Sequence, residues 1–230
     1  MKTLGLIGGM SWLSTIDYYR IINQLTNEQL GALNSAKIFL CSVNFEDFKV
    51  SMGNGDWGAI AEMLTGAAGK LEAAGAECII ICANTPHMVA NYVQLGVDIP
   101  LIHIAEATAE KIANNHIKKI ALLGTRITME QNFFKAKLAQ KQIITLVPNA
   151  EDRQFIHDAV FNELGKGIFA PDTKARFIEI INELVRQGAG GVIFGCTEFP
   201  YLINQEDCGI PIFDTTIIHA KAAVEFSLKK

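Results

Sequence analysis

The sequence lacks the features that mark several large classes of protein. No apolar run reaches the ~18 residues that a membrane helix needs, and the amino terminus does not have the layout of a signal peptide. There is no basic cluster, and the net charge is −4. These absences argue against a membrane protein and against nucleic acid as a partner, and they predict a cytoplasmic location.

Paired cysteines at metal-binding or disulfide-framework spacing are also lacking. The five cysteines are an odd number, and free thiols in a reducing compartment fit them better than disulfides. No cluster of His, Cys and Asp has metal-site spacing, so we expect no metal. Gly8 and Gly9 are not followed by the third glycine of a dinucleotide-binding fingerprint. Cys41, Cys78 and Cys208 lie in unremarkable settings and are expected to be inert.

The pattern of apolar runs predicts an α/β fold with parallel sheets, because buried strands alternate with helical segments. The expected strands are residues 3–8, 37–43, 78–82, 100–103, 119–124, 143–147, 191–195 and 211–213. The expected helices are residues 14–30, 57–74, 105–115, 129–141, 151–165, 172–187 and 215–229.

An internal repeat divides the chain into two related halves. Three pairs of segments match in the same order at offsets of 116, 113 and 111 residues: 4–8 with 120–124, 75–81 with 188–194, and 99–103 with 210–214. This period is too long for a solenoid. We therefore expect two pseudo-symmetric lobes, each a parallel sheet flanked by helices, with a small-molecule site in the cleft between them. Lobe one would be residues 1–102 plus 215–230, and lobe two residues 103–214.

Aligning the two halves of the chain with each other shows which residues at the strand ends correspond. At an offset of 113 residues, Cys82 falls opposite Gly195 and Ala83 falls opposite Cys196. Because side chains alternate along a strand, a shift of one residue points a side chain to the other face. If Cys196 faces the substrate, Ala83 is expected to face it from the other lobe, and Cys82 points aside.

Cys196, Thr197 and Glu198 form the segment most suggestive of chemistry. They directly follow an apolar run, so the thiol lies at the end of a buried strand. The alternative is that Cys196 is a small core side chain. Helix N–H groups beside a thiol lower its pKa, and a thiol so placed is a candidate acid/base.

Two loops that follow strands are candidates for binding an anion. The loop with Met10 and Ser11 opens a helix, where backbone N–H groups could hold a carboxylate; a plain tight turn is the alternative. Thr125 follows the equivalent strand of lobe two and is a second candidate contact. Arg126 and Lys166 are candidate charge partners, although either could be a solvated surface charge.

The end of the third strand carries polar side chains at the edge where open α/β sheets bind ligands. Asn84 and Thr85 are therefore candidate substrate contacts, with an Asx-type turn as the alternative. His87 is expected to cap or support its neighbours. His103 and His219 are expected to be structural rather than metal ligands.

Taken together, these motifs resemble the cofactor-independent aspartate/glutamate racemase superfamily over the whole chain, and the broad-specificity amino-acid racemase branch of the aspartate racemases in particular. The resemblance rests on residues 5–12, 84–87, 124–126 and 195–198, which stand in the family's order and spacing. It implies an isomerase with no pyridoxal phosphate or other cofactor, and commonly a homodimer. It also implies two cysteines that exchange the α-proton of an amino acid from opposite faces, a chemistry that suits thiols because their pKa can be tuned near neutrality.

The sequence departs from the family's pattern at two positions. The first cysteine of the family would stand at Ala83, and Cys82 is one residue early. The family's lysine for a substrate's side-chain carboxylate would fall near Gly165, with Lys166 beside it. The resemblance thus implies Cys196 as the main catalytic thiol and Cys82 as a register-shifted second candidate. The substrate contacts it implies are Met10, Ser11, Ala83, Asn84, Thr85, Thr125, Thr197, Glu198 and Lys166.

Two other functions remain open from the sequence. One is a decarboxylase or isomerase of small dicarboxylates that needs a single thiol, which suits Ala83. The other is a non-catalytic protein that binds an amino acid.

Overall fold

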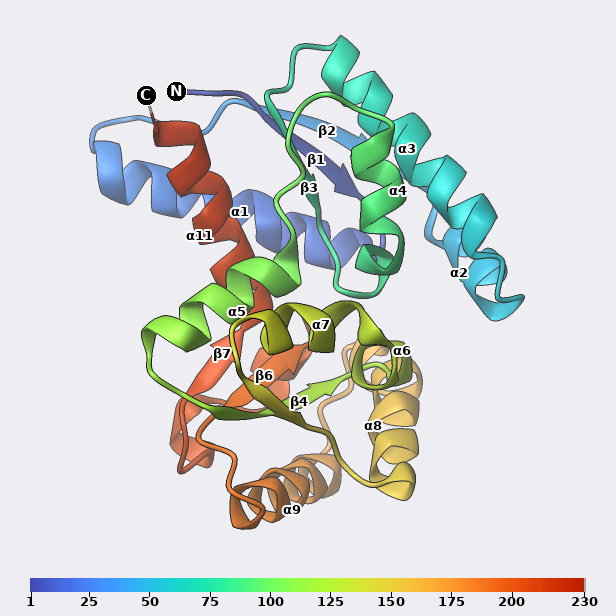
Figure 1. Cartoon of the computed structure of the whole chain (residues 1–230), viewed down its shortest axis with the longest axis vertical. Helices are drawn as coiled ribbons and strands as arrows, with labels where there is room; N and C mark the ends of the chain where they lie inside the picture. Colours follow the sequence, from blue (N-terminus) through green and yellow to red (C-terminus); the bar gives the residue numbers. More distant parts are fainter. Residues whose placement is uncertain (230) are drawn as a thin grey trace. The chain divides into compact units, whose positions relative to one another are not determined.

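The computed structural model describes residues 1–229, and the chain folds as two compact units. Unit 1 comprises Met1–Ala107 and the carboxy-terminal segment that starts at Thr216, and unit 2 comprises Thr108–Thr215. Both units combine parallel strands with helices (Figure 1). No helix in the described part of the chain is both long and apolar enough to cross a membrane.

Seven strands alternate with the helices along the chain. The strands are β1 (Leu4–Gly8), β2 (Ile38–Ser42), β3 (Cys78–Ile81), β4 (Lys119–Gly124), β5 (Ile144–Leu146), β6 (Val192–Gly195) and β7 (Ile212–Asp214). The helices are α1 (Trp12–Leu30), α2 (Phe45–Gly53), α3 (Trp57–Ala73), α4 (Ala90–Leu95), α5 (Ile104–Asn114), α6 (Arg126–Glu130), α7 (Asn132–Gln140), α8 (Ala150–Asn162), α9 (Pro171–Arg186), α10 (Phe199–Leu202) and α11 (Thr215–Leu228). Short 3-10 helices are η1 (Thr85–Val89), η2 (Leu164–Lys166) and η3 (Gln205–Asp207).

Each unit contains one parallel sheet. Unit 1 has strand order β2-β1-β3, and unit 2 has order β5-β4-β6-β7. The predicted α/β class with two helix-flanked parallel sheets is confirmed. All strands end at one edge of their sheet, which is where polar side chains following a parallel strand come together.

The strand register confirms the internal repeat. In unit 1, Ile7 of β1 lies opposite Ile81 of β3. In unit 2, Leu123 of β4 lies opposite Phe194 of β6. Because Leu123 is 116 residues after Ile7 and Phe194 is 113 residues after Ile81, the two pairings are equivalent. The ends of β3 and β6 therefore correspond as the sequence predicted.

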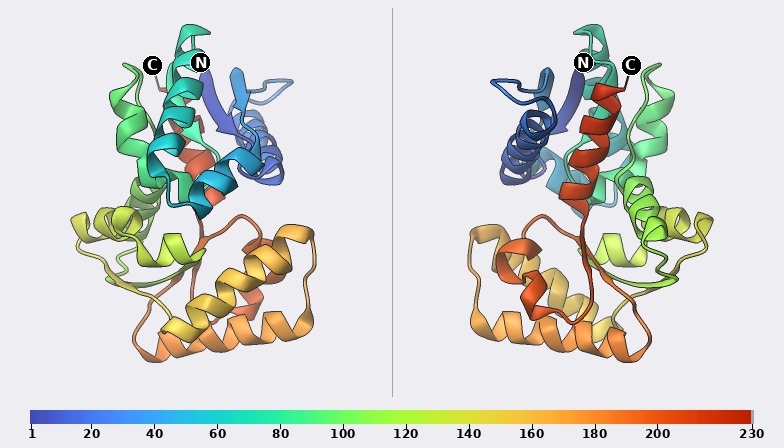
Figure 2. Two further views of the ribbon diagram at one scale, coloured as in Figure 1. Left: turned by 90° about the vertical axis from the view of Figure 1, so that its right-hand side faces the viewer. Right: turned by 90° about the vertical axis from the view of Figure 1, so that its left-hand side faces the viewer.

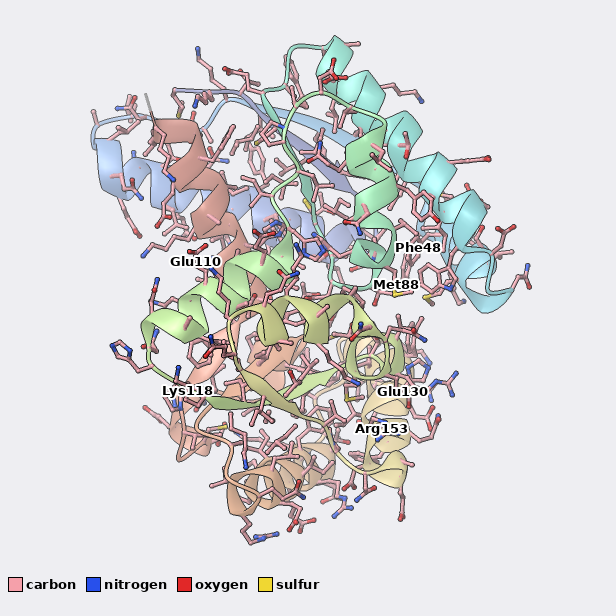
Figure 3. The ribbon with its side chains drawn as sticks, viewed as in Figure 1. Phe48, Met88, Glu110, Lys118, Glu130 and Arg153 are labelled. Carbon is pink, nitrogen blue, oxygen red and sulfur yellow. The ribbon has the colours of Figure 1, made fainter. Side chains whose placement is uncertain are left out.

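In unit 1, apolar side chains cover both faces of the sheet. One cluster joins the sheet to α1 and α11 and contains Leu6, Tyr18 and Cys82. A second cluster joins the opposite face to α2 and α3 and contains Phe48 and Ala83, with Met88 packed against it (Figure 3). Cys82 and Ala83 thus belong to opposite faces of the sheet, as expected for consecutive residues at the end of a strand.

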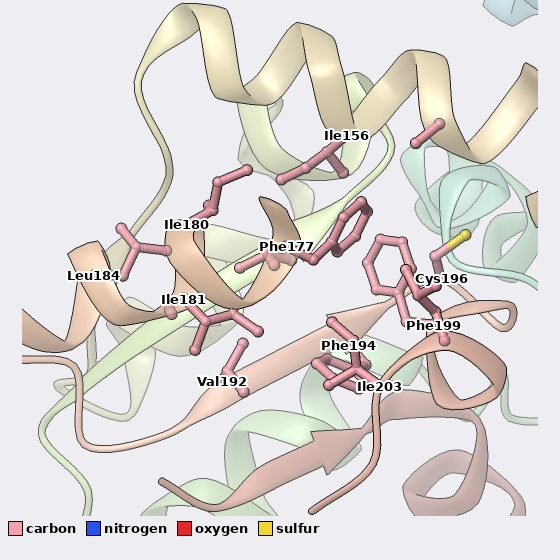
Figure 4. Packing of buried hydrophobic residues seen from close by; sticks show 14 of the residues in the cluster. Ile156, Phe177, Ile180, Ile181, Leu184, Val192, Phe194, Cys196, Phe199 and Ile203 are labelled. Atoms are coloured by element: carbon pink, nitrogen blue, oxygen red, sulfur yellow. The ribbon is translucent and has the colours of Figure 1, made fainter. Parts of the chain in front are cut away.

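In unit 2, the core lies between the sheet and the helices α8, α9 and α10. Ile156, Phe177, Phe194 and Phe199 are fully or almost fully buried in it (Figure 4). Three aromatic rings meet edge to face: Phe177 with Phe199 at 5.2 Å between centroids, and Phe194 with Phe199 at 5.7 Å. Cys196 lies at the margin of this cluster, so a well-packed core fixes the strand end that carries the thiol.

Two expected elements differ from the structure. Residues 100–103 make a single parallel bridge, between Ile79 and Leu101, instead of a strand; Pro100 has no N–H to donate, and the chain turns into α5 at Ile104. The expected helix 129–141 is two helices, α6 and α7, separated by the extended residue Gln131.

Helix α2 was not predicted. Asn44 caps it by accepting the backbone N–H of Glu46, and Glu46 and Asp47 occupy its first turn. This capping residue and the two acidic residues are a recognisable start signal. The pattern of apolar residues in α2 is weak, because the helix contributes only one fully buried side chain, Phe48, to the core.

Candidate functional site

The loop after β1 is held in place by the first turn of α1. Gly9 donates its backbone N–H to the Thr15 hydroxyl at 2.8 Å, and Ser11 caps α1 by accepting the backbone N–H of Ser14. The Met10 side chain is buried in the core of unit 1. Met10 and Ser11 could therefore contact a substrate mainly through their backbone.

Gly9 has a backbone conformation that requires glycine. Its φ is +93°, and a Cβ atom at this position would lie 2.1 Å from the carbonyl oxygen of Val43. The loop after β1 consequently passes directly against the chain that leaves β2. Only a residue without a side chain allows this approach.

The end of β3 places Cys82 and Ala83 in different surroundings. Cys82 is 1% exposed, lies in the apolar cluster with Tyr18, and its Sγ is 3.9 Å from the Ile80 carbonyl oxygen. Burial raises the pKa of its thiol far above the ordinary range. This placement argues against the acid/base role expected for Cys82. Ala83 lies on the opposite face and offers no ionisable group.

Sequence reasoning missed Ser14, which ties the two loops of unit 1 together. Its hydroxyl lies 2.8 Å from the carbonyl oxygen of Ser11 and 3.0 Å from that of Cys82. The loop with Met10 and Ser11 is thereby connected to the end of β3. The spacing Ser11-x-x-Ser14 is a helix-start signal, but nothing in it indicates the long-range contact to Cys82.

Asn84 and His87 lie directly after Ala83 and are buried. The His87 ring donates from Nδ1 to the Ala83 carbonyl oxygen at 2.8 Å, and its Nε2 accepts the backbone N–H of Ile104 at 3.2 Å. Both ring nitrogens are thus engaged in neutral hydrogen bonds, which matches the supporting role expected for His87. The ring links the end of β3 to the start of α5.

Three histidines meet behind this segment. The His87 ring lies 4.8 Å from that of His103 and 5.5 Å from that of His219, measured between centroids. His219 donates from Nε2 to the Ile102 carbonyl oxygen and accepts from the Tyr18 hydroxyl, both at 2.7 Å. These hydrogen bonds are structural. Among residues 1–229, no group of three or more His, Cys, Asp or Glu side chains is arranged to hold a metal ion.

The buried histidines make stability depend on pH. Burial lowers the pKa of His219 from 6.5 to about 4, and burial with the nearby His103 and His219 lowers the pKa of His87 well below its usual value. As pH falls below 6.5, the unfolded chain takes up protons at these rings before the folded chain does, so stability falls. His219 alone accounts for about 3 kcal/mol by pH 4. Urea unfolding between pH 7 and pH 4 measures this loss.

A flat stability profile across this pH window would contradict the assignment of neutral, buried rings. The matched control is His116→Asn, because His116 is exposed and has a positive φ that asparagine tolerates. We expect the control to keep the pH dependence of the wild-type chain, and His219→Asn to reduce it.

In unit 2, Thr125 follows β4 as the capping residue of α6. Its hydroxyl accepts the backbone N–H of Thr128 at 3.4 Å and lies 3.2 Å from the Thr128 hydroxyl. Arg126 contacts α8, where its guanidinium lies 3.4 Å from the Gln154 side-chain oxygen. Close by on the same two helices, Glu130 and Arg153 form an ion pair at 2.9 Å (Figure 3). Arg126 is therefore part of a surface network between α6 and α8.

Lys166 lies in η2, is exposed, and precedes Gly167, which has φ +76°. Gly165 beside it has no room for a side chain in this conformation, since a Cβ atom would lie 2.9 Å from the Val160 carbonyl oxygen. The lysine expected near Gly165 from the resemblance thus has no direct replacement at that position.

Cys196, Thr197 and Glu198 form a hydrogen-bonded group at the end of β6. The Cys196 thiol donates to Oε2 of Glu198 at 2.9 Å, and the Thr197 hydroxyl donates to the same oxygen at 2.8 Å. Gly124 and Gly195 lie opposite each other in the last pair of the β4–β6 register, so Thr125 and Cys196 are the first residues beyond it. The structure therefore brings these expected site residues of unit 2 to one edge of its sheet.

The protonation state of Cys196 differs from the sequence-based expectation. Burial, followed by the Glu198 carboxylate and its hydrogen bond, raises the thiol pKa well above its ordinary value, although the backbone N–H groups of Thr197 and Glu198 act in the opposite direction. The sequence predicts that helix N–H groups lower this pKa. The net shift is in the opposite direction, because burial and then the Glu198 carboxylate outweigh those N–H groups at the start of the four-residue helix α10. Burial and the neighbouring carboxylate therefore favour the thiol form of Cys196 over the thiolate.

Known proteins are similar to this chain over its full length. The sequence profile of the Asp/Glu/hydantoin racemase family matches residues 7–223. The broad specificity amino-acid racemase RacX of Bacillus subtilis (strain 168) is 24% identical over 234 residues, which is 96% of each chain. Two crystal structures match 100% of both chains: a Yersinia pestis protein assigned to the Asp/Glu racemases (TM-score 0.95, 47% identity) and an aspartate racemase homologue from Pyrococcus horikoshii OT3 (TM-score 0.88, 34% identity).

The profile covers nearly the whole chain, and both of these structures exceed 30% identity over the complete fold. The segments that carry the candidate site, from the loop after β1 to the end of β6, lie inside the matched region. The protein is therefore a member of the Asp/Glu/hydantoin racemase family, a family of isomerases.

Proposed function

We propose that this protein is an amino-acid racemase that moves the α-proton of aspartate or glutamate without pyridoxal phosphate, with Cys196 as its main acid/base. The observation that carries the proposal is the hydrogen bond from the Cys196 thiol to Glu198. A thiol that shares its proton with a carboxylate has both an acid form and a route to its base form.

The proposed step transfers one proton between Cys196 and the α-carbon of the substrate. With the thiol protonated, Cys196 delivers its proton to the α-carbon of a carbanion: the S–H bond breaks and the C–H bond forms. In the reverse direction Glu198 takes the thiol proton, and the resulting Cys196 thiolate removes the α-proton. Thr197 donates to the same Glu198 oxygen and orients it. Glu198 therefore acts on the substrate through Cys196, as a positioning residue.

The carbanion needs preorganised donors. In this proposal they are the backbone at Met10 and Ser11 and the side chains of Asn84, Thr85, Thr125 and Thr197, with Lys166 as a candidate for the side-chain carboxylate. Ala83 stands where the first cysteine of the family pattern would be, and Cys82 is assigned no proton-transfer role because it faces the apolar cluster of α1 and α11. An ordered water would serve the Ala83 face.

Exchange of the α-proton in deuterated water tests the function directly. Each enantiomer of aspartate and glutamate is incubated with the protein, and deuterium at the α-carbon is followed by NMR. We expect exchange with at least one enantiomer of one of these substrates. Absence of exchange with all four would overturn the proposal, and thermal stabilisation by aspartate in that case would indicate a binding protein.

The variant Ala83→Cys tests the missing second thiol within the same experiment. A positioned acid/base contributes roughly 10²–10⁴-fold to a proton transfer, so even imperfect placement is expected to raise racemisation about 10-fold or more. Cys82→Ala is the matched control and should leave the exchange rate unchanged. An unchanged rate in Ala83→Cys would mean that another proton relay already serves this face.

Ala83, which cannot transfer a proton, favours a second candidate function. A decarboxylase or isomerase of small dicarboxylates needs a proton delivered to one face only, which a single thiol at position 196 provides. Stereospecific product from a malonate-like or maleate-like acid, with no α-proton exchange of amino acids, would identify this alternative.

The proposal extends to location and assembly. A racemase with five free thiols, Cys196 among them, functions in a reducing compartment, and we place it in the cytoplasm. We also propose that it functions as a homodimer.

A further inference from the structure

Ser14 is a buried polar residue that has no part in the proton transfer proposed above. It lies in the first turn of α1 and is 2% exposed. Its hydroxyl is within hydrogen-bond distance of two carbonyl oxygens, one in the loop after β1 and one at the end of β3. Figure 2 shows α1 alongside the strands of unit 1, and its first turn lies where these strands end.

The single hydroxyl hydrogen of Ser14 is available for Cys82. The Ser11 carbonyl oxygen also accepts from the Thr15 hydroxyl at 3.0 Å, and Thr15 in turn accepts the backbone N–H of Gly9 at 2.8 Å. Because Thr15 supplies a donor to Ser11, the Ser14 hydroxyl can donate to the Cys82 carbonyl oxygen at 3.0 Å. Ser14 therefore links the loop after β1 to the end of β3.

Buried side chains from outside the strand hold the peptide groups on both sides of Ala83. Ser14 donates to the carbonyl oxygen of Cys82, in the peptide group before Ala83. His87 donates from Nδ1 to the carbonyl oxygen of the peptide group after it, at 2.8 Å. Peptide groups are planar, so holding these two fixes the direction in which the Ala83 Cβ points. Both donors are buried, so water does not compete for these hydrogen bonds.

The two loops that Ser14 connects have different tasks in the proposed reaction. The backbone at Met10 and Ser11 supplies donors to the carbanion, and Ala83 marks the face of the α-carbon that Cys196 does not serve. Met10 and Ala83 belong to the same apolar cluster, and the Ser14 hydrogen bond fixes the distance between their loops. A misplacement of about 1 Å can cost about 100-fold in rate. Proton transfer on the Ala83 face therefore depends on this distance.

We propose that Ser14 is a positioning residue that holds the Ala83 face in register with the loop after β1. This role rests on the proposed racemase function and concerns one face of the substrate. Without the Ser14 hydroxyl the loop after β1 stays in place, because Ser11 still accepts the backbone N–H of residue 14 and Thr15 still accepts that of Gly9. Proton transfer by Cys196 on the other face does not require Ser14.

The variant Ser14→Ala in deuterated water tests this role. Deuterium that enters one enantiomer with retention of configuration reports Cys196, and deuterium in the opposite enantiomer reports transfer on the Ala83 face. We expect Ser14→Ala to slow the inversion of aspartate or glutamate about 10-fold or more, and to leave exchange with retention and KM nearly unchanged. An equal fall in both rates would mean general damage to the fold and would overturn the proposal, as would an unchanged rate of inversion.

Thr26→Val is the matched control on the same helix. Thr26 is fully buried, and its hydroxyl has no hydrogen-bond partner among residues 1–229. Valine removes this buried hydroxyl from α1 without removing a hydrogen bond, and its shape is close to that of threonine. We expect the control to keep the wild-type rates of both inversion and exchange with retention.

Exchange of backbone amides separates a failure of this role from a failure of the racemase function. The amides of Cys82 and Ala83 donate to the carbonyl oxygens of Ile7 and Ile81, both at 2.9 Å. In Ser14→Ala these two amides should exchange about 10-fold faster than in the wild-type chain, because the end of β3 has lost a buried hydrogen bond. Thr26→Val should leave them unchanged.

The amide measurement does not need a substrate. If the wild-type chain exchanged no α-proton with any of the four substrates, the racemase function would fail, and the amides would decide on Ser14. Faster amide exchange in Ser14→Ala would then support Ser14 as the residue that holds the end of β3. Amide rates equal to those of the wild-type chain would overturn this role whatever the activity.

Discussion

Replacing Cys196 by alanine is expected to reduce α-proton exchange by roughly 10²–10⁴-fold, the usual contribution of a positioned acid/base. In the proposed mechanism, the Cys196 thiol both gives and takes a proton, and its 2.9 Å hydrogen bond to Glu198 is the route. Alanine keeps the strand end intact because the side chain lies at the margin of the unit 2 core. Deuterium incorporation, measured by NMR with each enantiomer of aspartate and glutamate, gives the result.

Cys208→Ala is the control for this experiment. Cys208 belongs to the same core cluster and is buried to a similar degree, but it follows η3 in the chain, whereas Cys196 directly follows β6. The control should retain wild-type exchange with the same general loss of core packing. If Cys196→Ala and Cys208→Ala exchanged equally fast, Cys196 would have no catalytic part, and the proposed mechanism would fail even if the protein bound amino acids.

Gly9→Ala is expected to destabilise unit 1 by about 4 kcal/mol or more, which places it in the exceptional class of single substitutions. The new Cβ would lie 2.1 Å from the Val43 carbonyl oxygen, and φ at this position is +93°. Relief requires the loop after β1 to separate from the chain after β2. Urea unfolding gives the loss directly, and a fall in Tm of roughly 10 °C or more is the thermal equivalent.

Gly66→Ala is the matched glycine variant, because Gly66 lies inside α3 with nothing within 4 Å of an added Cβ. Alanine there should raise stability by up to about 1 kcal/mol, since it favours the helix. Equal effects of the two variants would show that the close approach at Gly9 is not a constraint. The same loop contains Met10 and Ser11, so a folded Gly9→Ala chain should also bind substrate more weakly.

Most of the strands could be predicted from the sequence, because a buried parallel strand has a nearly uninterrupted run of apolar residues. The repeat could be predicted for the same reason: each half needs such runs at the same spacing. The register of β1 with β3 and of β4 with β6 bears this out. Helix α2 was missed because its contribution to the core is one phenylalanine, so its pattern of apolar residues is weak.

The side on which each strand-end residue lies also followed from the sequence. Alternation along a strand is a local property, so aligning Ala83 with Cys196 was enough to separate Ala83 from Cys82. The structure places Cys82 among the buried side chains against α1 and α11 and places Ala83 on the opposite face.

The pKa of the Cys196 thiol could not be predicted from the alternation of side chains along a strand. The sequence shows that Glu198 follows Cys196 by two residues. Whether the Glu198 carboxylate accepts a hydrogen bond from the thiol depends on the turn into α10 and on the core in which Phe199 is packed. Likewise, the contact of Ser14 with the Cys82 carbonyl oxygen joins residues 68 positions apart. The sequence by itself determined the strands, the repeat and the position of Cys196. The tertiary structure alone decided that the pKa of this thiol is raised, because burial and the approach of a carboxylate are properties of packing in three dimensions.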